Sequence, residues 1–354
     1  MACSAGLSAE EARARLLIDE TARLLELNLD GLSVLTEMAS GHYVYTPLIA
    51  ALAGAGKVAA IVKESQYGSR NDIIDRGLRL ADSWQVRERI EVLSSVSPTD
   101  IAQADIITNL GFIRPIDATF VSQMKHGAVI PYMREAWEYR PGDVDLIACR
   151  AENIPVMGTS ENYDGLKIFD FCGPLATKML YEAGLEVKGS RIIVASRDNF
   201  GNAIGAYLDA CGAEVHQVNG SGQFDLETTK RIDAILVACF VTDEVIVGRG
   251  GWFDPSALAN YHPECTVVQI CGNLDIESLN ACGVHCVPER PVEARRMAQT
   301  LAALGPRPVI ELHTAGLKVG ELMWHKMRTL QDAREVEQSL AKELGLCQRL
   351  GKIA

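Results

Sequence analysis

The sequence lacks the patterns that mark several common classes of protein. No basic run is present and the net charge is −12, which argues against a general nucleic-acid-binding role. No stretch of 18 apolar residues occurs, and residues 1–7 hold no charged segment followed by an apolar one, so neither a membrane span nor a signal peptide is expected. We expect a cytoplasmic protein with a small-molecule substrate and no nucleic-acid or membrane partner.

Several motifs of metal-binding, catalytic and phosphate-binding sites are also missing. The ten cysteines form no C-x-x-C pair, and several lie within apolar runs, so we expect reduced, buried thiols. No His/Cys cluster has ligand spacing, and hence no metal site is predicted. A G-x-S-x-G elbow is absent, and the residues around Gly56-Lys57 do not form a P-loop.

What the sequence does contain is an alternation of short apolar runs and helical patterns. At 354 residues and 48% hydrophobic content, two domains with sizeable cores are expected, and the alternation predicts parallel sheets. Strands are expected at 57–63, 91–94, 105–110, 128–133, 154–158, 191–195, 214–218, 233–239, 265–271 and 284–288. Helices are expected from a capping box at 8–11 to about residue 27, and at 71–83, 117–124, 144–151, 162–183, 224–230, 255–259, 276–282, 291–304 and 319–344.

Residues 188–219 predict strand, turn, helix and strand, which is the opening unit of a nucleotide-binding domain. The usual G-x-G-x-x-G is absent, however, because Ser196 and Asp198 replace its first two glycines and only Gly201 remains. A carboxylate at position 198 would repel a pyrophosphate, whereas Arg197 would attract it. Three hypotheses stay open: the turn binds NAD(P) in an altered pose, binds another anionic ligand, or is structural.

Four stretches resemble the D-2-hydroxyacid dehydrogenase family, the formate and glycerate dehydrogenase group. They are 143–159, Lys188-Gly-Ser-Arg-Ile-Ile-Val, Thr266-Val-Val-Gln-Ile-Cys-Gly-Asn-Leu and Val309-Ile-Glu-Leu-His-Thr-Ala-Gly, the last expected to be a strand or loop. The resemblance implies two Rossmann-like α/β domains with parallel sheets, the cofactor-type domain (161–304) being inserted into a flavodoxin-like domain (1–160 with 305–354). It also implies NADP or NAD as the cofactor and a substrate of the 2-hydroxy acid type. A homodimer is expected.

The resemblance carries over to individual residues unevenly. It implies that His313, with a pKa near its ordinary value, is the acid/base and that Glu289 orients it. Cys271 stands where the family has its substrate-binding arginine, so an atypical substrate is expected. The cofactor-binding residues would be Ser196, Arg197, Asp198, Asn199, Phe200, Gly201, Asn219, Cys239, Thr242 and Cys271. Asn219, which would face the ribose, replaces the acidic residue that selects NAD and would tolerate NADP.

Two loops that follow predicted strands are the candidates for substrate binding. Met133-Arg-Glu-Ala-Trp-Glu-Tyr-Arg140 contains Arg134 and Arg140, and Asn109-Leu-Gly-Phe-Ile-Arg114 contains Arg114. Ligands of α/β sheets lie at such strand ends. The leading prediction is an NAD(P)-dependent oxidoreductase of the 2-hydroxyacid dehydrogenase type. A non-redox lyase, hydrolase or transferase on the same scaffold and a non-catalytic ligand-binding protein remain alternatives.

Overall fold

The computed structural model describes residues 7–343 and 345–351 and divides the chain into two compact units. Unit 1 spans 1–167 and 305–354, and unit 2 spans 168–304. Two predictions fall on residues outside this described part. One is the absence of a signal peptide, which concerns residues 1–6, and the other is the end of the last helix at Leu344. Within the described part of the chain, no helix combines the length and hydropathy needed to cross a membrane.

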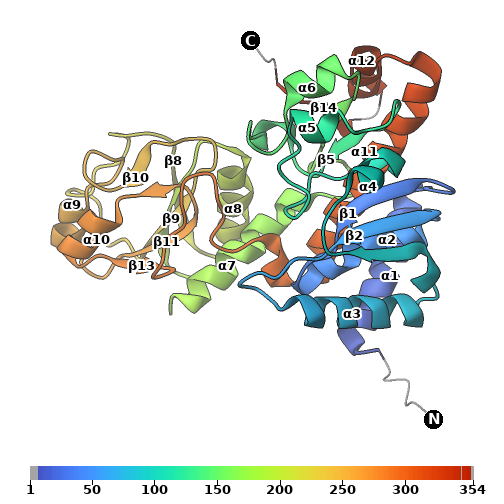
Figure 1. Cartoon of the computed structure of the whole chain (residues 1–354). Helices are drawn as coiled ribbons and strands as arrows, with labels where there is room; N and C mark the ends of the chain where they lie inside the picture. Colours follow the sequence, from blue (N-terminus) through green and yellow to red (C-terminus); the bar gives the residue numbers. More distant parts are fainter. Residues whose placement is uncertain (1–6, 344, 352–354) are drawn as a thin grey trace. The chain divides into compact units, whose positions relative to one another are not determined.

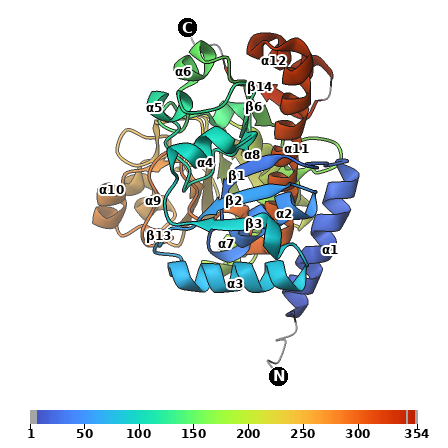
Figure 2. The same ribbon diagram turned by 45° about the vertical axis from the view of Figure 1, so that its right-hand side comes forward.

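Unit 1 is built on parallel strands that Figures 1 and 2 show side by side (for example β1, β2 and β3). One group of strands has the order β3-β2-β1-β4, and a parallel bridge from Ile106 to Val129 joins it to the group β5-β6-β14. Only β14 pairs antiparallel there, with β6. The order 3-2-1-4-5-6 is that of a Rossmann sheet, with its switch point between β1 and β4. The strands are β1 Ser33–Glu37, β2 Lys57–Ile61, β3 Ile90–Leu93, β4 Ile106–Ile107, β5 Ile130–Tyr132, β6 Val156–Thr159 and β14 Cys347–Arg349.

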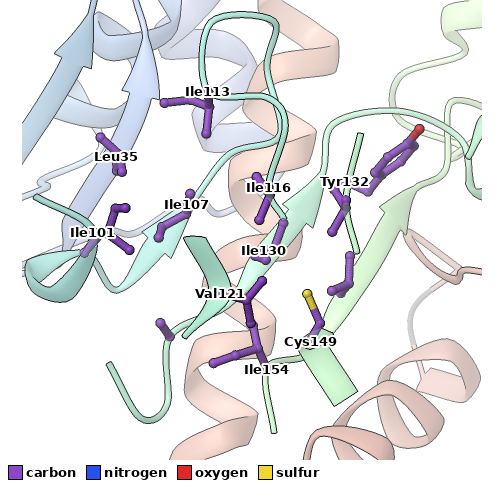
Figure 3. Close-up of a cluster of buried hydrophobic side chains, with 14 of the residues drawn as sticks. Leu35, Ile101, Ile107, Ile113, Ile116, Val121, Ile130, Tyr132, Cys149 and Ile154 are labelled. Carbon is purple, nitrogen blue, oxygen red and sulfur yellow. The ribbon is translucent and has the colours of Figure 1, made fainter. Parts of the chain in front are cut away.

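Different helices pack against the two faces of this sheet. Strand alternation sends Ile107 into a cluster with Ile101, Val121 and Cys149 from α4, α5 and α6 (Figure 3), whereas Ile106 meets Gly320 of α11. The helix α11 also packs on α1 and α2. The helices of unit 1 are α1 Ala9–Leu24, α2 Tyr45–Leu52, α3 Arg70–Ser83, α4 Pro98–Gln103, α5 Ala118–Val121, α6 Leu146–Ala151, α11 Pro306–Leu330 and α12 Ala333–Glu343, with 3-10 turns η1 Gly41–Val44, η2 Arg87–Arg89 and η3 Ala136–Glu138.

Unit 2 is a second Rossmann-like sheet, parallel throughout, with the order β13-β11-β9-β7-β8. Its strands are β7 Arg191–Ala195, β8 Glu214–Val218, β9 Ala234–Ala238, β11 Thr266–Cys271 and β13 His285–Val287, beside a small parallel pair, β10 Val245–Val247 and β12 Asn273–Leu274. Its helices are α7 Cys172–Glu182, α8 Asn199–Ala210, α9 Pro255–Tyr261 and α10 Ile276–Cys282, with 3-10 turns η4 Ile168–Phe171 and η5 Leu301–Leu304. The predicted α/β class with two Rossmann-like, parallel-sheet domains is confirmed.

Four predictions of secondary structure are wrong. Residues 224–230 form turns, because Asp225 accepts hydrogen bonds locally from the Glu227 amide and the Thr228 hydroxyl. Residues 291–304 are largely irregular, because backbone groups there bond to β11 and its flanks instead. Residues 309–316, expected as a strand or loop, lie within α11. The expected helix at 162–183 begins only at Cys172, after η4, so Pro174 lies in its first turn and does not kink it.

We expect substitution of Gly173 by alanine to destabilise unit 2. A Cβ on Gly173 would lie 2.3 Å from the Cβ and Cγ atoms of Tyr207, where α7 crosses α8. Relieving that overlap should cost about 1–3 kcal/mol of unfolding free energy, measured by chemical denaturation. In a Tyr207→Gly background both the Cβ and the ring are gone, and the same substitution should cost much less. Equal losses in the two backgrounds would show that the α7–α8 contact is not the cause.

Candidate active site in unit 1

The carboxyl ends of β1, β4, β5 and β6 bring a set of polar residues to one edge of the unit 1 sheet. Glu37 ends β1, Asn109 follows β4, Arg134 follows β5 and Glu161 follows β6. Parallel strands end at the same edge, and ligands of α/β sheets bind there at the switch point, which in unit 1 lies between β1 and β4. A hydrogen bond between the Thr36 and Thr108 hydroxyls, at 2.9 Å, joins these two strands beneath the edge.

Asn109 is a buried amide with one group still to be satisfied. Its Oδ1 accepts a hydrogen bond from the Met133 backbone amide at 2.8 Å, which ties the end of β4 to the end of β5. The side chain is 1% exposed, and its Nδ2 has no hydrogen-bond partner among the described residues. A buried amide donor without an acceptor is costly, and a bound ligand oxygen would satisfy it.

His313 lies inside α11 and is 3% exposed, so the predicted acid/base is buried in a helix. Its Nδ1 is 2.7 Å from the Thr46 hydroxyl, which itself donates to the Tyr43 carbonyl at 3.1 Å. Because a hydroxyl has only one hydrogen, Nδ1 must be the donor to Thr46. This hydrogen-bond network assigns the Nδ1–H tautomer and leaves the lone pair on Nε2 to accept a proton.

The predicted ordinary pKa of His313 is wrong. Burial, with a smaller contribution from the positive charge of Arg134, lowers the pKa of His313 to about 4. The imidazole is therefore neutral at pH 7. An anion bound next to Arg134 would offset that charge and raise the pKa of His313 toward the range in which a histidine exchanges protons.

Arg134 is the electrostatic centre of this edge. Its guanidinium acts on His313 and also lowers the pKa values of Glu37 and Glu161, which burial raises. The side chain is half-buried, and no carboxylate among the described residues forms an ion pair with it. A guanidinium in that state is suited to bidentate binding of a carboxylate or phosphate.

The two other predicted substrate arginines lie in the same region of unit 1. Arg114 forms an ion pair with Asp143 at 2.7 Å. Burial, followed by the charge of Arg134 and with a further contribution from Arg114, lowers the pKa of Arg140. The structure thus brings Arg114, Arg134 and Arg140 within electrostatic range of one another.

Sequence reasoning missed Glu37, Thr46 and Glu161. Glu37 is 6% exposed and accepts a hydrogen bond from the Phe112 amide at 2.6 Å, so it orders the loop that leads to Arg114. Burial, with smaller contributions from Glu138 and Glu135, raises the pKa of Glu161 well above its ordinary range. The strand β1, which ends at Glu37, was not expected from the sequence. Without that strand, nothing in the sequence indicates that Glu37 lies at the edge of the sheet.

In unit 2, the predicted phosphate loop is closed by its own side chain. Asp198 caps α8, its Oδ1 accepting from the Phe200 amide at 3.1 Å and the Ser196 hydroxyl at 3.0 Å. Its Oδ2 accepts from the Phe240 amide, across the sheet at the end of β9, at 2.7 Å. At the start of α8 the Phe200 amide is thus bound by the Asp198 carboxylate and the Gly201 amide by the Ser196 hydroxyl, so these two amides are not free for an external anion.

The other predicted cofactor residues surround that loop or lie near it. Arg197 donates to the Asn219 carbonyl and forms an ion pair with Glu244, both at 2.7 Å. Cys239 and Cys271 are buried at the ends of β9 and β11, where the Cys239 amide donates to the Cys271 carbonyl at 3.2 Å, and the Thr242 hydroxyl accepts from the Glu244 amide. The predicted roles of Asn199 and Asn219 toward a cofactor stay predictions.

Glu289 is an exposed residue of unit 2 that follows β13, whereas His313 belongs to unit 1. Their predicted partnership therefore stays a prediction. Among the described residues, no group of three or more His, Cys, Asp or Glu side chains is arranged to hold a metal ion.

A dinucleotide in the usual Rossmann pose does not fit unit 2. The usual pose needs free amides at the start of the helix and close backbone approach at the second glycine. Here Asp198 stands at that second position, and its carboxylate already binds the Phe200 amide. Any nicotinamide cofactor would have to avoid this carboxylate.

Comparison with known proteins gives the fold. No protein-family profile and no curated protein matches the sequence. The pyruvate reductase of Chlamydomonas reinhardtii superposes with a TM-score of 0.50 at 9% identity, over 85% of this chain and 97% of that one. The A chain of dipicolinate synthase from Bacillus subtilis gives 0.49 at 11% identity, over 86% and 99%. The NAD-dependent formate dehydrogenase of Staphylococcus aureus, in complex with NAD, gives 0.44 at 14% identity, over 78% and 98%.

The strand orders and the superposition at a TM-score of 0.50 define the chain first as an α/β protein of two Rossmann-like units, the fold of the 2-hydroxyacid dehydrogenases. More particularly, it resembles in structure the pyruvate reductase of Chlamydomonas reinhardtii, so the resemblance predicted from the sequence is confirmed for the fold. At such low identity the likeness concerns the fold alone.

Proposed function

We propose that the chain is an enzyme acting on a small carboxylate- or phosphate-bearing molecule bound at the carboxyl edge of the unit 1 sheet. The observation that carries this is Arg134, a half-buried guanidinium without an ion pair among the described residues, next to a neutral histidine. In this proposal Arg134 binds the anionic group and the Asn109 Nδ2 donates to a second ligand oxygen. The Nε2 of His313 then takes a proton from the reacting group, or returns one to it.

The first candidate for this activity is the one predicted from the sequence, an NAD(P)-dependent oxidoreductase of the 2-hydroxyacid dehydrogenase type, which requires the dinucleotide to bind in a pose that avoids Asp198. Its support is the shared fold, together with a histidine and an anion site of the kind that removal of a carbinol proton requires. The homodimer predicted from the sequence likewise stays a proposal.

A non-redox enzyme on the same scaffold is the second candidate, and a specific observation favours it. The carboxylate of Asp198 fills the position at which a dinucleotide pyrophosphate is bound in this fold. Acid–base chemistry at His313 does not depend on that position and would serve a lyase or hydrolase equally well.

The test is a panel of small anions added to the full chain. We expect oxalate, malonate or inorganic phosphate at about 100 times its Kd to stabilise the protein by about 2.7 kcal/mol, seen as a rise in melting temperature. Choline at the same ionic strength is the control, since a cation has no partner at Arg134. A chain that none of the three anions stabilises would not carry the proposed site.

A further inference from the structure

Unit 2 has the topology of a dinucleotide-binding domain, but two of its own side chains occupy the place of the ligand. The strand order β8-β7-β9 puts the switch point between β7 and β9, and ligands of such sheets bind outside the carboxyl ends of those strands. Asp198 follows β7 and Phe240 follows β9, and the hydrogen bond between the Asp198 carboxylate and the Phe240 amide crosses this point at 2.7 Å.

The bonds of Asp198 differ from those of an ordinary helix cap. Asp254, which caps α9 in the same unit, uses Oδ1 alone for the Ser256 and Ala257 amides, at 2.8 and 3.3 Å. Asp198 uses one oxygen for its own helix and the other for the neighbouring strand. It thereby links the start of α8 to the end of β9, the two places whose amides would face a phosphate.

The residues at the glycine positions of the usual loop show that this turn keeps the close packing of the helix but not the access for a ligand. A Cβ on Gly201 would lie 2.5 Å from the Cβ of Ser196, so the third glycine of the pattern still permits close packing of α8 on β7. The second glycine, which in a dinucleotide site gives the pyrophosphate access to the backbone, is Asp198. The residue needed for packing is present, and the one needed for the ligand is replaced by an anion.

Arg197 closes the other half of the crevice. Its guanidinium lies 4.7 Å from the centre of the Trp252 ring, forms an ion pair with Glu244 and donates to the carbonyl of Asn219. The Trp252 indole N–H also donates to Glu244, at 3.0 Å, which holds the group together. Asn219 follows β8, where a dinucleotide's ribose would lie, so Arg197 spans the adenosine side.

We propose that Asp198 supplies from the chain itself the negative charge that a pyrophosphate supplies in a dinucleotide-binding unit, and that Arg197 and Asp198 together close the unit 2 crevice to dinucleotides. Asp198 is then the residue that determines specificity in unit 2. This inference is independent of the anion site in unit 1 and selects the non-redox candidate over a nicotinamide bound in the usual pose.

The experiment measures binding of NADH and NADPH to the full chain, by calorimetry and by melting temperature. Asp198→Ser keeps a capping side chain and removes the charge, and Asp198→Gly restores the glycine of the usual loop. Asp254→Ser is the matched control, because it changes a cap in the same unit without touching the crevice. Circular dichroism confirms that each variant is folded.

We expect no binding by the wild-type chain or Asp254→Ser at about 1 mM dinucleotide, and binding with a Kd of about 1–100 µM by at least one Asp198 variant. Adding Arg197→Ala should strengthen it further. Micromolar binding by the wild type, or no gain in either Asp198 variant, would overturn the inference. Oxalate binding measured on the same variants should stay unchanged, so failure here is distinguishable from failure of the unit 1 proposal.

Discussion

Replacing Arg134 by methionine is expected to weaken binding of oxalate to the full chain by about 10–100-fold. A charge-assisted hydrogen-bonded contact contributes roughly 1.5–3 kcal/mol, and each 1.4 kcal/mol corresponds to a factor of ten. Methionine keeps much of the packing of the arginine stem, so the protein should remain folded. Calorimetric titration of the wild type and the variant measures the ratio directly.

Two further variants make this result specific to the site. Arg134→Lys keeps the charge but loses the fork of donors, so its affinity should fall between those of the wild type and Arg134→Met. Arg150→Met removes an exposed charge from α6 of the same unit and should leave the affinity unchanged. If both methionine variants weaken binding equally, the anion responds to overall charge and Arg134 is not its ligand.

The second large effect is the pH dependence of stability caused by His313. The pKa of His313 is about 4 in the folded protein, compared with about 6.5 in an unfolded chain. Above pH 6.5 both states are neutral and the histidine adds no pH dependence. As the pH falls from 6.5 to 4 the unfolded state takes up a proton and the folded state does not, so stability falls by about 3 kcal/mol in total.

His313→Gln removes this proton while keeping a side-chain partner for Thr46. The free energy of unfolding of the wild type minus that of the variant should therefore fall by about 3 kcal/mol between pH 7 and pH 4, measured by urea denaturation. Taking the difference cancels other groups with shifted pKa values, such as Glu37 and Glu161. The exposed His285, changed to glutamine in a control, should show the pH dependence of the wild type. Parallel curves for His313→Gln and the wild type would contradict a buried, neutral imidazole.

The fold was largely predictable because its signals are local. The capping box at Ser8 and the β-branched runs such as 191–195 predicted elements that the structure contains, here α1 and β7. The errors arise where distant partners compete with local preference. In the segment 291–304, the Val292 amide donates a hydrogen bond to the Gln269 side chain and the Ala298 amide donates to the Ile270 carbonyl. No local sequence pattern reveals these bonds. Conversely, Pro306 and Pro308 suggest an irregular segment but occupy the first turn of α11, where a missing N–H is tolerated.

The candidate site was predictable only in part, for the same physical reason. Arginines that follow strands indicated the edge of unit 1 at which we propose the site, because strand ends converge in a parallel sheet. The chemistry of His313 depends on Thr46, which lies 267 positions away in the chain, and on the packing of α11 on α2. The chemistry of Asp198 depends on the Phe240 amide, 42 positions away. A sequence shows that a carboxylate replaces a glycine, but not that the carboxylate is already satisfied.

The division of unit 1 into two chain segments has a consequence for how the protein is made. The segments are separated by residues 168–304, that is 304 − 168 + 1 = 137 residues, which take roughly 7–27 s to synthesise at 5–20 residues per second. During that interval α1, α2 and β6 have emerged, but α11 and β14, which pack on them, have not. The nascent N-terminal segment of unit 1 therefore exposes an apolar surface until α11 is made, and His313, the proposed acid/base, is made only after that interval.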